Sequence, residues 1–99
     1  MVVLINTFEV EPASADVFLR TWKQVSQVME NRPGFLRTRF HRALAGSRFV
    51  NVGEWEDEDS FHAAVASPEF QDAAGRLAGL ATMSPGLYEI VYESAAPDV

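Results

Sequence analysis

The β-rich stretch FVNVGEWED spans residues 49–57. Every second position from 51 to 55 holds an asparagine, then a glycine, then a tryptophan. Side chains along a strand point to opposite faces in turn, so Asn51, Gly53 and Trp55 share a face. Branched apolar residues would pack better on a buried face. An amide, a missing side chain and an indole therefore suggest the floor and wall of a ligand pocket. The structural alternative is a β-bulge at Gly53, an internally bonded Asn51 and a core Trp55.

A second asparagine interrupts another apolar strand face, near the start of the chain. Asn6 lies between Leu4 and Phe8 on one face of the β-rich segment 2–10. A buried amide needs hydrogen-bond partners. Asn6 either points into the same pocket as Asn51 or bonds to a neighbouring loop.

The region from about residue 58 to residue 79 is rich in alanine and glycine. Helices with such small side chains either pack very close to a sheet or leave a hollow above it. Because protein interiors avoid empty hollows, a hollow would point to a ligand. If it is lined by Trp22, Trp55, Phe61 and Phe70, it would accept a flat aromatic molecule.

Two titratable residues could reach such a pocket. His62 follows Phe61 on a predicted helix and could act as an acid–base group near neutral pH. Arg76, on the next helical segment, is the cation best placed to bind a substrate. His41 is expected at the surface, and neither histidine has the spacing of a metal-binding pair, so no metal site is predicted.

The elements that must position these residues follow the order β-α-β-β-α-β. Strands are predicted at 2–10, 35–42, 48–56 and 87–93, and helical segments at about 15–30, 58–66 and 68–77. Ser14 is the expected N-cap of the first helix, and Ser67 followed by Pro68 restarts the second. The segment 84–86, Ser-Pro-Gly, is expected to form a turn, and residues 94–99 a frayed tail. This order predicts a single ferredoxin-like α+β domain, residues 1–99, with a four-stranded antiparallel sheet.

Several strands of this sheet carry apolar residues on both faces. Val3 and Ile5 oppose Leu4, and Val50 and Val52 oppose Phe49. Helices cover only one face of such a sheet, so a second subunit is expected on the other. The sequence therefore predicts a homodimer, with the two sheets forming an α+β barrel.

The composition excludes several partners and chemistries. The net charge of −6 argues against nucleic acid and anionic membranes, since both need a basic surface. There is no cysteine, so disulfides and thiolate catalysis are excluded. No segment approaches the roughly 20 apolar residues of a membrane span, and a cytoplasmic location is expected. A basic cluster on the central hairpin is interpreted as a solvated face that balances the acidic run at 54–59: Arg37, Arg39, Arg42 and Arg48.

The chain resembles the antibiotic biosynthesis monooxygenase family over nearly its whole length. The segments that carry the resemblance are VVLINTFEV, ENRPGFLRTRFHRA and FVNVGEWEDEDSFHAAVASPEF. The Pro-Gly-Phe turn and the unit formed by Trp55, Glu56 and Phe61 recur across that family and mark its dimeric α+β barrel fold.

The quinone-forming branch of this family oxidises anthrone-like polyketide phenols with dioxygen, without flavin, haem or metal. Its asparagine and tryptophan have the spacing of Asn51 and Trp55, so the resemblance implies catalytic roles for this pair. That branch has a tyrosine where this chain has Phe61. Its helical arginine falls near Ala74, two residues from Arg76.

The haem-degrading branch shares an asparagine in the first strand, which matches Asn6. That branch also needs an axial histidine and a tryptophan, and those positions read as Gly75 and Ala64 here. Haem iron would have no anchor without the axial ligand, so haem degradation ranks low.

The resemblance implies a cofactor-free enzyme that oxidises an electron-rich polycyclic phenol to a quinone with dioxygen. Asn51 and Trp55 would hold the phenolate and Asn6 would assist, because amide and indole N–H groups can stabilise an oxyanion. The substrate would contact Trp22, Gly53, Phe61, His62, Phe70 and Arg76. The alternatives are an aromatic polyketide cyclase or isomerase, and a non-catalytic binding module of the same fold.

Overall fold

The computed structural model describes residues 1–98, and its elements follow the predicted order. Three strands and all the helical segments lie within two residues of their predicted bounds. The elements are β1 Val2–Val10, the 3₁₀ turn η1 Pro12–Ser14, α1 Ala15–Glu30, β2 Phe35–Arg42, β3 Arg48–Trp55, α2 Glu58–Val65, α3 Pro68–Gly75 and β4 Ala81–Tyr88.

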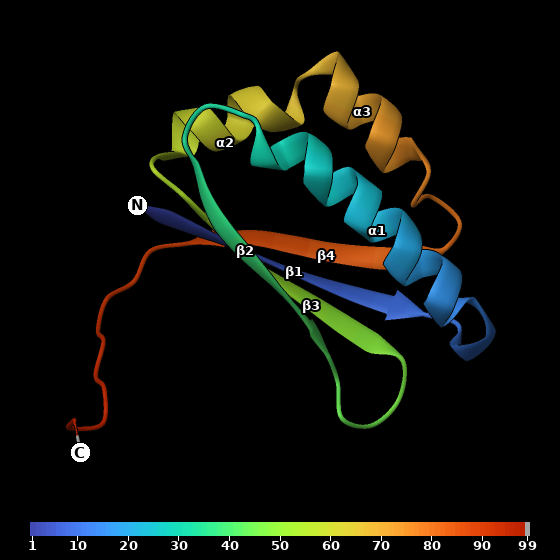
Figure 1. The fold of residues 1–99 in the computed structure, drawn as a ribbon, viewed down its shortest axis with the longest axis horizontal. Coiled ribbons are helices and arrows are strands. Elements are labelled where there is room, and N and C mark those ends of the chain that lie inside the picture. The colour runs from blue at the N-terminus through green and yellow to red at the C-terminus, as the bar shows by residue number, and fades with distance from the viewer. Residues whose placement is uncertain (99) are drawn as a thin grey trace.

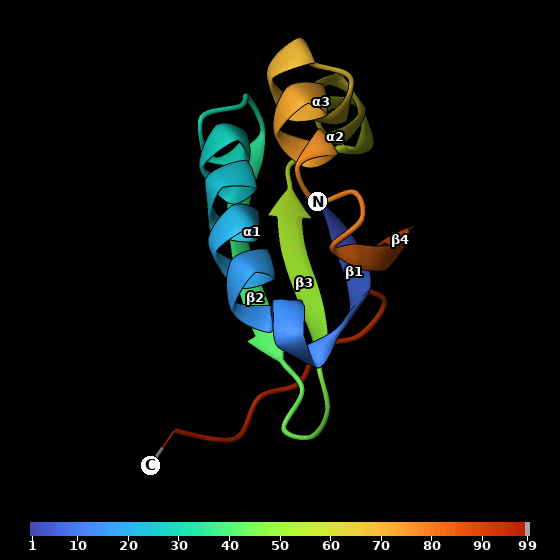
Figure 2. The same cartoon turned by 90° about the vertical axis from the view of Figure 1, so that its right-hand side faces the viewer.

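The four strands form one antiparallel sheet in the order β2-β3-β1-β4. The helices α1, α2 and α3 all lie over the same face of this sheet, and its other face is open (Figures 1 and 2). The ferredoxin-like α+β fold is thereby confirmed. Its two central strands, β1 and β3, carry both asparagines of the expected pocket.

The pairing of the strands places the polar residues beside one another. Asn6 of β1 lies directly opposite Asn51 of β3, and Leu4 lies opposite Gly53. On the other side of β3, Thr38 of β2 lies opposite Gly53. Gly53 is therefore regularly paired on both sides, and the bulge considered for it is absent. The irregularity falls instead in β2, between Phe35 and Arg37.

The prediction for the last strand was wrong. β4 spans Ala81–Tyr88 rather than 87–93, so the expected turn at 84–86 lies inside the strand. β4 is an edge strand bonded only to β1, and an edge strand tolerates Pro85 because an outward N–H is not needed for pairing. The chain instead turns just before β4, where Gly79 has a φ of 84°. Residues 89–98 have no helix or strand, and Val99 of the predicted tail lies outside the described residues.

Local signals fix the helix ends. Ser67 caps α3 by accepting a 3.2 Å hydrogen bond from the N–H of Phe70. Asp57 caps α2 by accepting a 2.7 Å bond from the N–H of Ser60, and this bond lowers the pKa of its carboxyl. Ser14 occupies the N-cap position of α1, but its side chain makes no capping bond there.

A tight turn links α1 to β2 and touches the start of α2. Gly34 in this turn has a φ of 85°, which few residues other than glycine adopt. Its carbonyl accepts a 2.8 Å bond from the N–H of Glu56. A side chain at this position would collide with Ser60 of α2.

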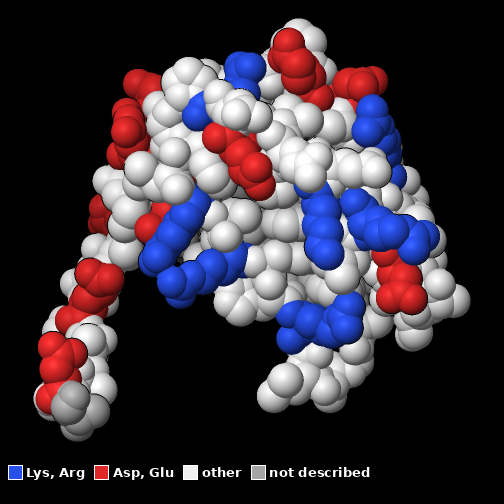
Figure 3. Space-filling view, viewed as in Figure 1, with Lys and Arg blue, Asp and Glu red and all other residues white. Residues whose placement is uncertain are grey.

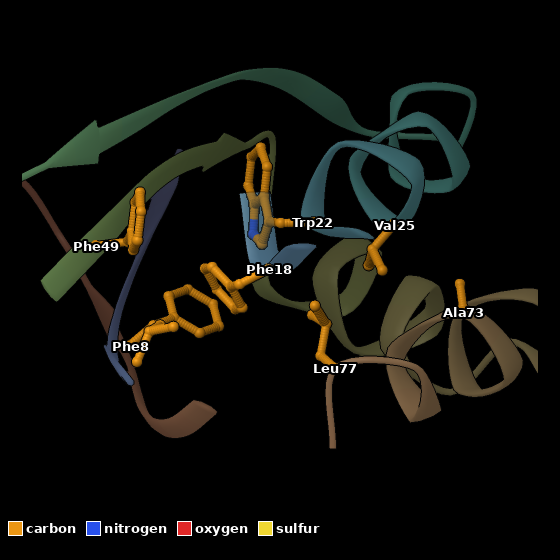
Figure 4. Packing of buried hydrophobic residues seen from close by; sticks show 8 residues of the cluster. Phe8, Phe18, Trp22, Val25, Phe49, Ala73 and Leu77 are labelled. Atoms are coloured by element: carbon orange, nitrogen blue, oxygen red, sulfur yellow. The ribbon is translucent and has the colours of Figure 1, made fainter. Parts of the chain in front are cut away.

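The core consists of two clusters of buried side chains. The larger joins β1, β3, α1 and α3 and contains Phe8, Phe18, Trp22 and Leu77 (Figure 4). The smaller, at the other end of the sheet, contains Met29, Trp55 and Ala64. The buried residues of α1 recur at helical spacing and form the face that meets the sheet: Phe18, Trp22, Val25 and Met29. Within residues 1–98, the helices are too short or too polar to cross a bilayer.

Candidate active site

A cavity of about 340 Å³ lies between the sheet and the helical layer. Members of both core clusters line it, among them Trp22 and Leu77 from the larger and Met29 and Trp55 from the smaller. The cavity thus lies between the two core clusters and separates them. Its volume is within the range of small-molecule sites, roughly 300–1,000 Å³.

Three polar side chains from three adjacent strands form the floor. Asn6, Thr38 and Asn51 all line the cavity. Asn6 and Asn51 are directly opposed across β1 and β3, so their Cβ atoms are about 4.5–5.5 Å apart. The remaining lining is almost wholly apolar, and these groups are therefore the main means of orienting a polar ligand.

The hydrogen bonds of this floor leave the NH₂ group of Asn51 and the side-chain oxygen of Asn6 available to a ligand. The hydroxyl of Thr38 donates to Oδ1 of Asn51. The same hydroxyl lies 3.5 Å from the carbonyl oxygen of Val52, and Nδ2 of Asn51 has no hydrogen bond recorded among residues 1–98. Across the strand pair, Oδ1 of Asn6 is buried and has no partner among the described residues. A buried acceptor without a partner costs free energy, so a ligand hydroxyl at this point would be favoured.

Gly53 provides the space beside these amides. A Cβ atom at this position would lie 3.3 Å from Oγ1 of Thr38 and 3.7 Å from Nδ2 of Asn51. Any side chain here would therefore fill the space in front of the Asn51 amide. The absence of a side chain keeps this donor accessible from the cavity.

Aromatic rings form the walls. Trp55 is only 2% exposed and meets Phe35 and Phe61 edge to face, with ring centroids 5.3 and 5.8 Å apart. Trp22, from α1, also lines the cavity, and its ring stacks on that of Phe40 with the centroids 3.7 Å apart. Trp55 is thus both a core residue and a wall of the cavity. Phe70, from α3, completes the set of predicted aromatic lining residues.

His62 and Arg76 do not reach the cavity. The side chain of His62 is exposed on α2, and its ring lies against Phe61. Arg76 is exposed and pairs with Asp72 at 3.5 Å. Seven of the nine predicted site residues line the cavity, and these two do not. No cluster of three or more His, Cys, Asp or Glu residues that could hold a metal ion occurs within 1–98.

Several residues that line the cavity were not among those predicted from the sequence. Thr38 shares a strand face with Phe40, and its position opposite Gly53 could have been inferred by pairing the hairpin. Met83 and Pro85 were missed because β4 was misplaced. They are the two exposed residues of the lining, so the mouth of the cavity opens at β4.

Known proteins of similar sequence and structure share this fold. The profile of the family described as "Antibiotic biosynthesis monooxygenase" matches residues 1–76. The chain therefore belongs to the antibiotic biosynthesis monooxygenase family.

Three relatives carry more specific descriptions. Deoxynogalonate monooxygenase of Streptomyces nogalater is 31% identical over 88 residues, covering 88% of this chain and 74% of the relative. The structure of SnoaB, a cofactor-independent oxygenase from the same organism, is 30% identical with a TM-score of 0.83, covering 98% of this chain and 97% of that one. Heme oxygenase (mycobilin-producing) of Mycobacterium tuberculosis (strain ATCC 25618 / H37Rv) is 29% identical, covering 89% of this chain and 85% of the relative. These relatives support a monooxygenase.

The cavity offers a poor ligand set for haem. Haem iron is usually held by histidine, thiolate, tyrosinate, or methionine together with histidine. Of these, the described lining contains only the thioethers of Met29 and Met83. His41 and His62 both lie outside it, and position 75 is an exposed glycine. The residues present therefore do not fit haem.

Proposed function

We propose that this protein is a cofactor-independent monooxygenase that oxidises an electron-rich polycyclic phenol, of the anthrone type, to a quinone. In this reaction a ring CH₂ and O₂ give a ring C=O and H₂O. The four electrons that reduce dioxygen come from the CH₂ carbon, so the reaction balances without another reductant.

The single observation that supports this proposal best is the pairing of a donor and an acceptor in an apolar cavity. Nδ2 of Asn51 can donate to the substrate carbonyl, which becomes an oxyanion once the CH₂ loses a proton. Oδ1 of Asn6 can accept from a neighbouring ring hydroxyl. Stabilising the anion makes the substrate a better electron donor to dioxygen. The aromatic walls exclude water from the reactive intermediates.

The described lining contains no carboxylate, imidazole or amine. The proton of the CH₂ group therefore leaves to water or to another substrate group. In this scheme the protein stabilises the anion that results and does not supply a strong base. Trp22, Trp55, Phe61 and Phe70 hold the flat ring system by stacking and edge contacts.

The test uses a hydroxylated anthrone under ¹⁸O₂, with spontaneous oxidation subtracted. We expect faster quinone formation with protein, one ¹⁸O atom in the product and one O₂ consumed per product. Asn51→Ala should lower kcat by about 10²–10³-fold, as the loss of an oxyanion donor does elsewhere. Gln24→Ala, on the exposed side of α1 and outside the cavity lining, is the matched control and should retain full activity.

Other outcomes separate the alternatives. A product that has lost water without gaining oxygen would identify a cyclase. Binding of the anthrone without turnover would indicate a binding module. No acceleration with any of a panel of anthrones would overturn the proposal. A Soret band with hemin that Met29→Ala and Met83→Ala abolish would reverse the conclusion on haem.

We also propose that the protein acts as a homodimer through the open face of the sheet. Ile5, Val50 and Val52 lie on this face, away from the helices, and are only half-buried. A second copy would cover them and close the two sheets into a barrel. Sedimentation equilibrium should give twice the mass of 11.0 kDa. Val52→Glu should shift the protein to monomer with its fold retained.

A further inference from the structure

One polar side chain of the cavity lining comes from the helical layer rather than from the sheet. Ser26 of α1 lines the cavity and lies at helical spacing from Trp22 and Met29, which line it too. The other polar side chains of the lining form the floor and belong to strands. Ser26 therefore faces the floor from the opposite side of the cavity.

The hydroxyl of Ser26 is available to a ligand. Serine and threonine in helices often donate back to the carbonyl four residues earlier, as Thr21 of the same helix does to Val17 at 2.8 Å. Ser26 is half-buried, and no hydrogen bond of its side chain is recorded among residues 1–98. Figure 3 shows charged side chains over the visible outer surface, whereas the described lining of the cavity contains none. Within that lining, Ser26 is the polar group that the helices present to a ligand.

The floor sets the direction in which the proposed substrate extends. An anthrone carries its carbonyl and the neighbouring ring hydroxyls on one edge, and its reactive CH₂ on the opposite edge of the central ring. Hydrogen bonds to a carbonyl lie near the plane of its substituents, so a ring bound by Asn51 and Asn6 stands upright on the floor. Its far edge then faces the helical layer that covers this side of the sheet (Figure 2), and with it Ser26. The reacting carbon and the Ser26 hydroxyl thus lie on the same side of the cavity.

We propose that Ser26 donates a hydrogen bond to the terminal oxygen of a hydroperoxide on the substrate while the O–O bond breaks. This inference rests on the proposed oxygenase function and adds a catalytic residue to it. The carbon of the substrate anion first forms a C–O bond with dioxygen, which is reduced to a peroxide, and water supplies the proton that completes the hydroperoxide. The remaining C–H proton then leaves to water, its electron pair forms the C=O bond, and the O–O bond breaks. The terminal oxygen leaves as hydroxide, which together with that proton makes H₂O.

The second of these steps is the one that needs a donor on the helical side. Negative charge develops on the terminal oxygen as it leaves, and a positioned O–H group stabilises such a charge in an apolar site. The amides of Asn6 and Asn51 cannot take this part, because they bind the opposite edge of the ring. The Ser26 hydroxyl lies on the correct side and has its proton free to donate.

Removing this hydroxyl alone tests the role. Ser26→Ala should keep the helix, because alanine is the best helix former. We expect kcat for anthrone oxidation to fall at least about tenfold, with little change in KM, since the contact forms only after oxygen has added. A single turnover quenched in acid should contain, by mass spectrometry, a species heavier than the substrate by one O₂. Wild-type protein should show little of this hydroperoxide.

Val25→Ala is the matched control, because Val25 lines the cavity from the neighbouring position of α1 and has no polar group. This variant should raise KM without accumulating the hydroperoxide, and accumulation in both variants would contradict a specific role for the hydroxyl. Ser26→Ala with wild-type kcat, or with a lower kcat and no hydroperoxide, would overturn the role of Ser26 and leave the oxygenase proposal standing. A wild-type protein that oxidises none of a panel of anthrones would overturn both.

Discussion

At the scale of single residues, the site depends on the orientation of one amide. Asn51 can present its NH₂ group to the cavity because its oxygen accepts a bond from Thr38. An asparagine free to rotate would offer its oxygen half the time, and an acceptor would repel a developing oxyanion. Thr38 therefore positions the proposed donor without touching the reacting carbon.

Removing only the Thr38 hydroxyl tests this role. Thr38→Val keeps the shape of the side chain, so the cavity walls should not change. We expect kcat for anthrone oxidation to fall about tenfold, less than for Asn51→Ala, with little change in KM. Thr38→Ser should restore much of the activity because it returns the hydroxyl. An unchanged kcat in the valine variant would show that Asn51 is held in some other way.

Gly53 lends itself to a similar test. In Gly53→Ala the new methyl group would lie 3.3 Å from Oγ1 of Thr38, closer than most such contacts. The neighbour must shift, and the space in front of Asn51 is filled. We expect a higher KM and a lower kcat, with circular dichroism unchanged. Gly75→Ala is the control, because its added Cβ would have no atom of another part of the chain within 4 Å among the described residues. Equal activity in both variants would contradict a substrate position beside Gly53.

At the scale of elements, the sequence predicted the site where the strands alternate regularly. Asn6, Asn51, Gly53 and Trp55 were placed on the correct face because side-chain direction in a strand follows from residue number alone. Helical residues were harder to place. His62 and Arg76 were expected near the cavity, but small rotations of α2 and α3 decide which face meets the sheet.

The error in β4 has a different cause. Pro85 and Gly86 are strong turn signals, and they would be turn residues in most contexts. Whether a strand lies at the edge of its sheet depends on the tertiary topology, which local sequence does not encode. Most of the strand signal at 87–93 came from Ile90, Val91 and Tyr92, which lie beyond the end of β4 in the exposed segment 89–98.

The caps of α1 and α3 allow a paired test of helix stability. Ser67 is 5% exposed, accepts from Phe70 N–H and donates a 2.7 Å bond to the carbonyl of Ala64. Ser67→Ala should reduce the free energy of unfolding by about 1–2 kcal/mol. Ser14→Ala should have a much smaller effect, because Ser14 makes no side-chain capping bond. Urea unfolding measures both, and equal losses would contradict the assigned caps.

At the scale of the whole molecule, the cavity separates the two core clusters. The side chains around it lose packing contacts, so the cavity reduces the stability of the fold. Ala74 of α3 lines this cavity. Ala74→Leu should fill part of the void and raise the stability by about 1 kcal/mol. The same variant should lose most anthrone oxidation, because the added side chain takes the space of the substrate. Ala63→Leu, on the exposed side of α2, should leave activity unchanged. Retained activity in Ala74→Leu would show that the substrate does not bind beside Ala74.

The contact between Gly34 and Ser60 has a consequence for genetics. The turn that contains Gly34 touches the start of α2 at Ser60. A side chain at position 34 would therefore displace Ser60. Phe61, a wall of the cavity, immediately follows Ser60. Alleles selected for loss of oxidation should therefore include replacements of Gly34, even though this glycine contacts no substrate.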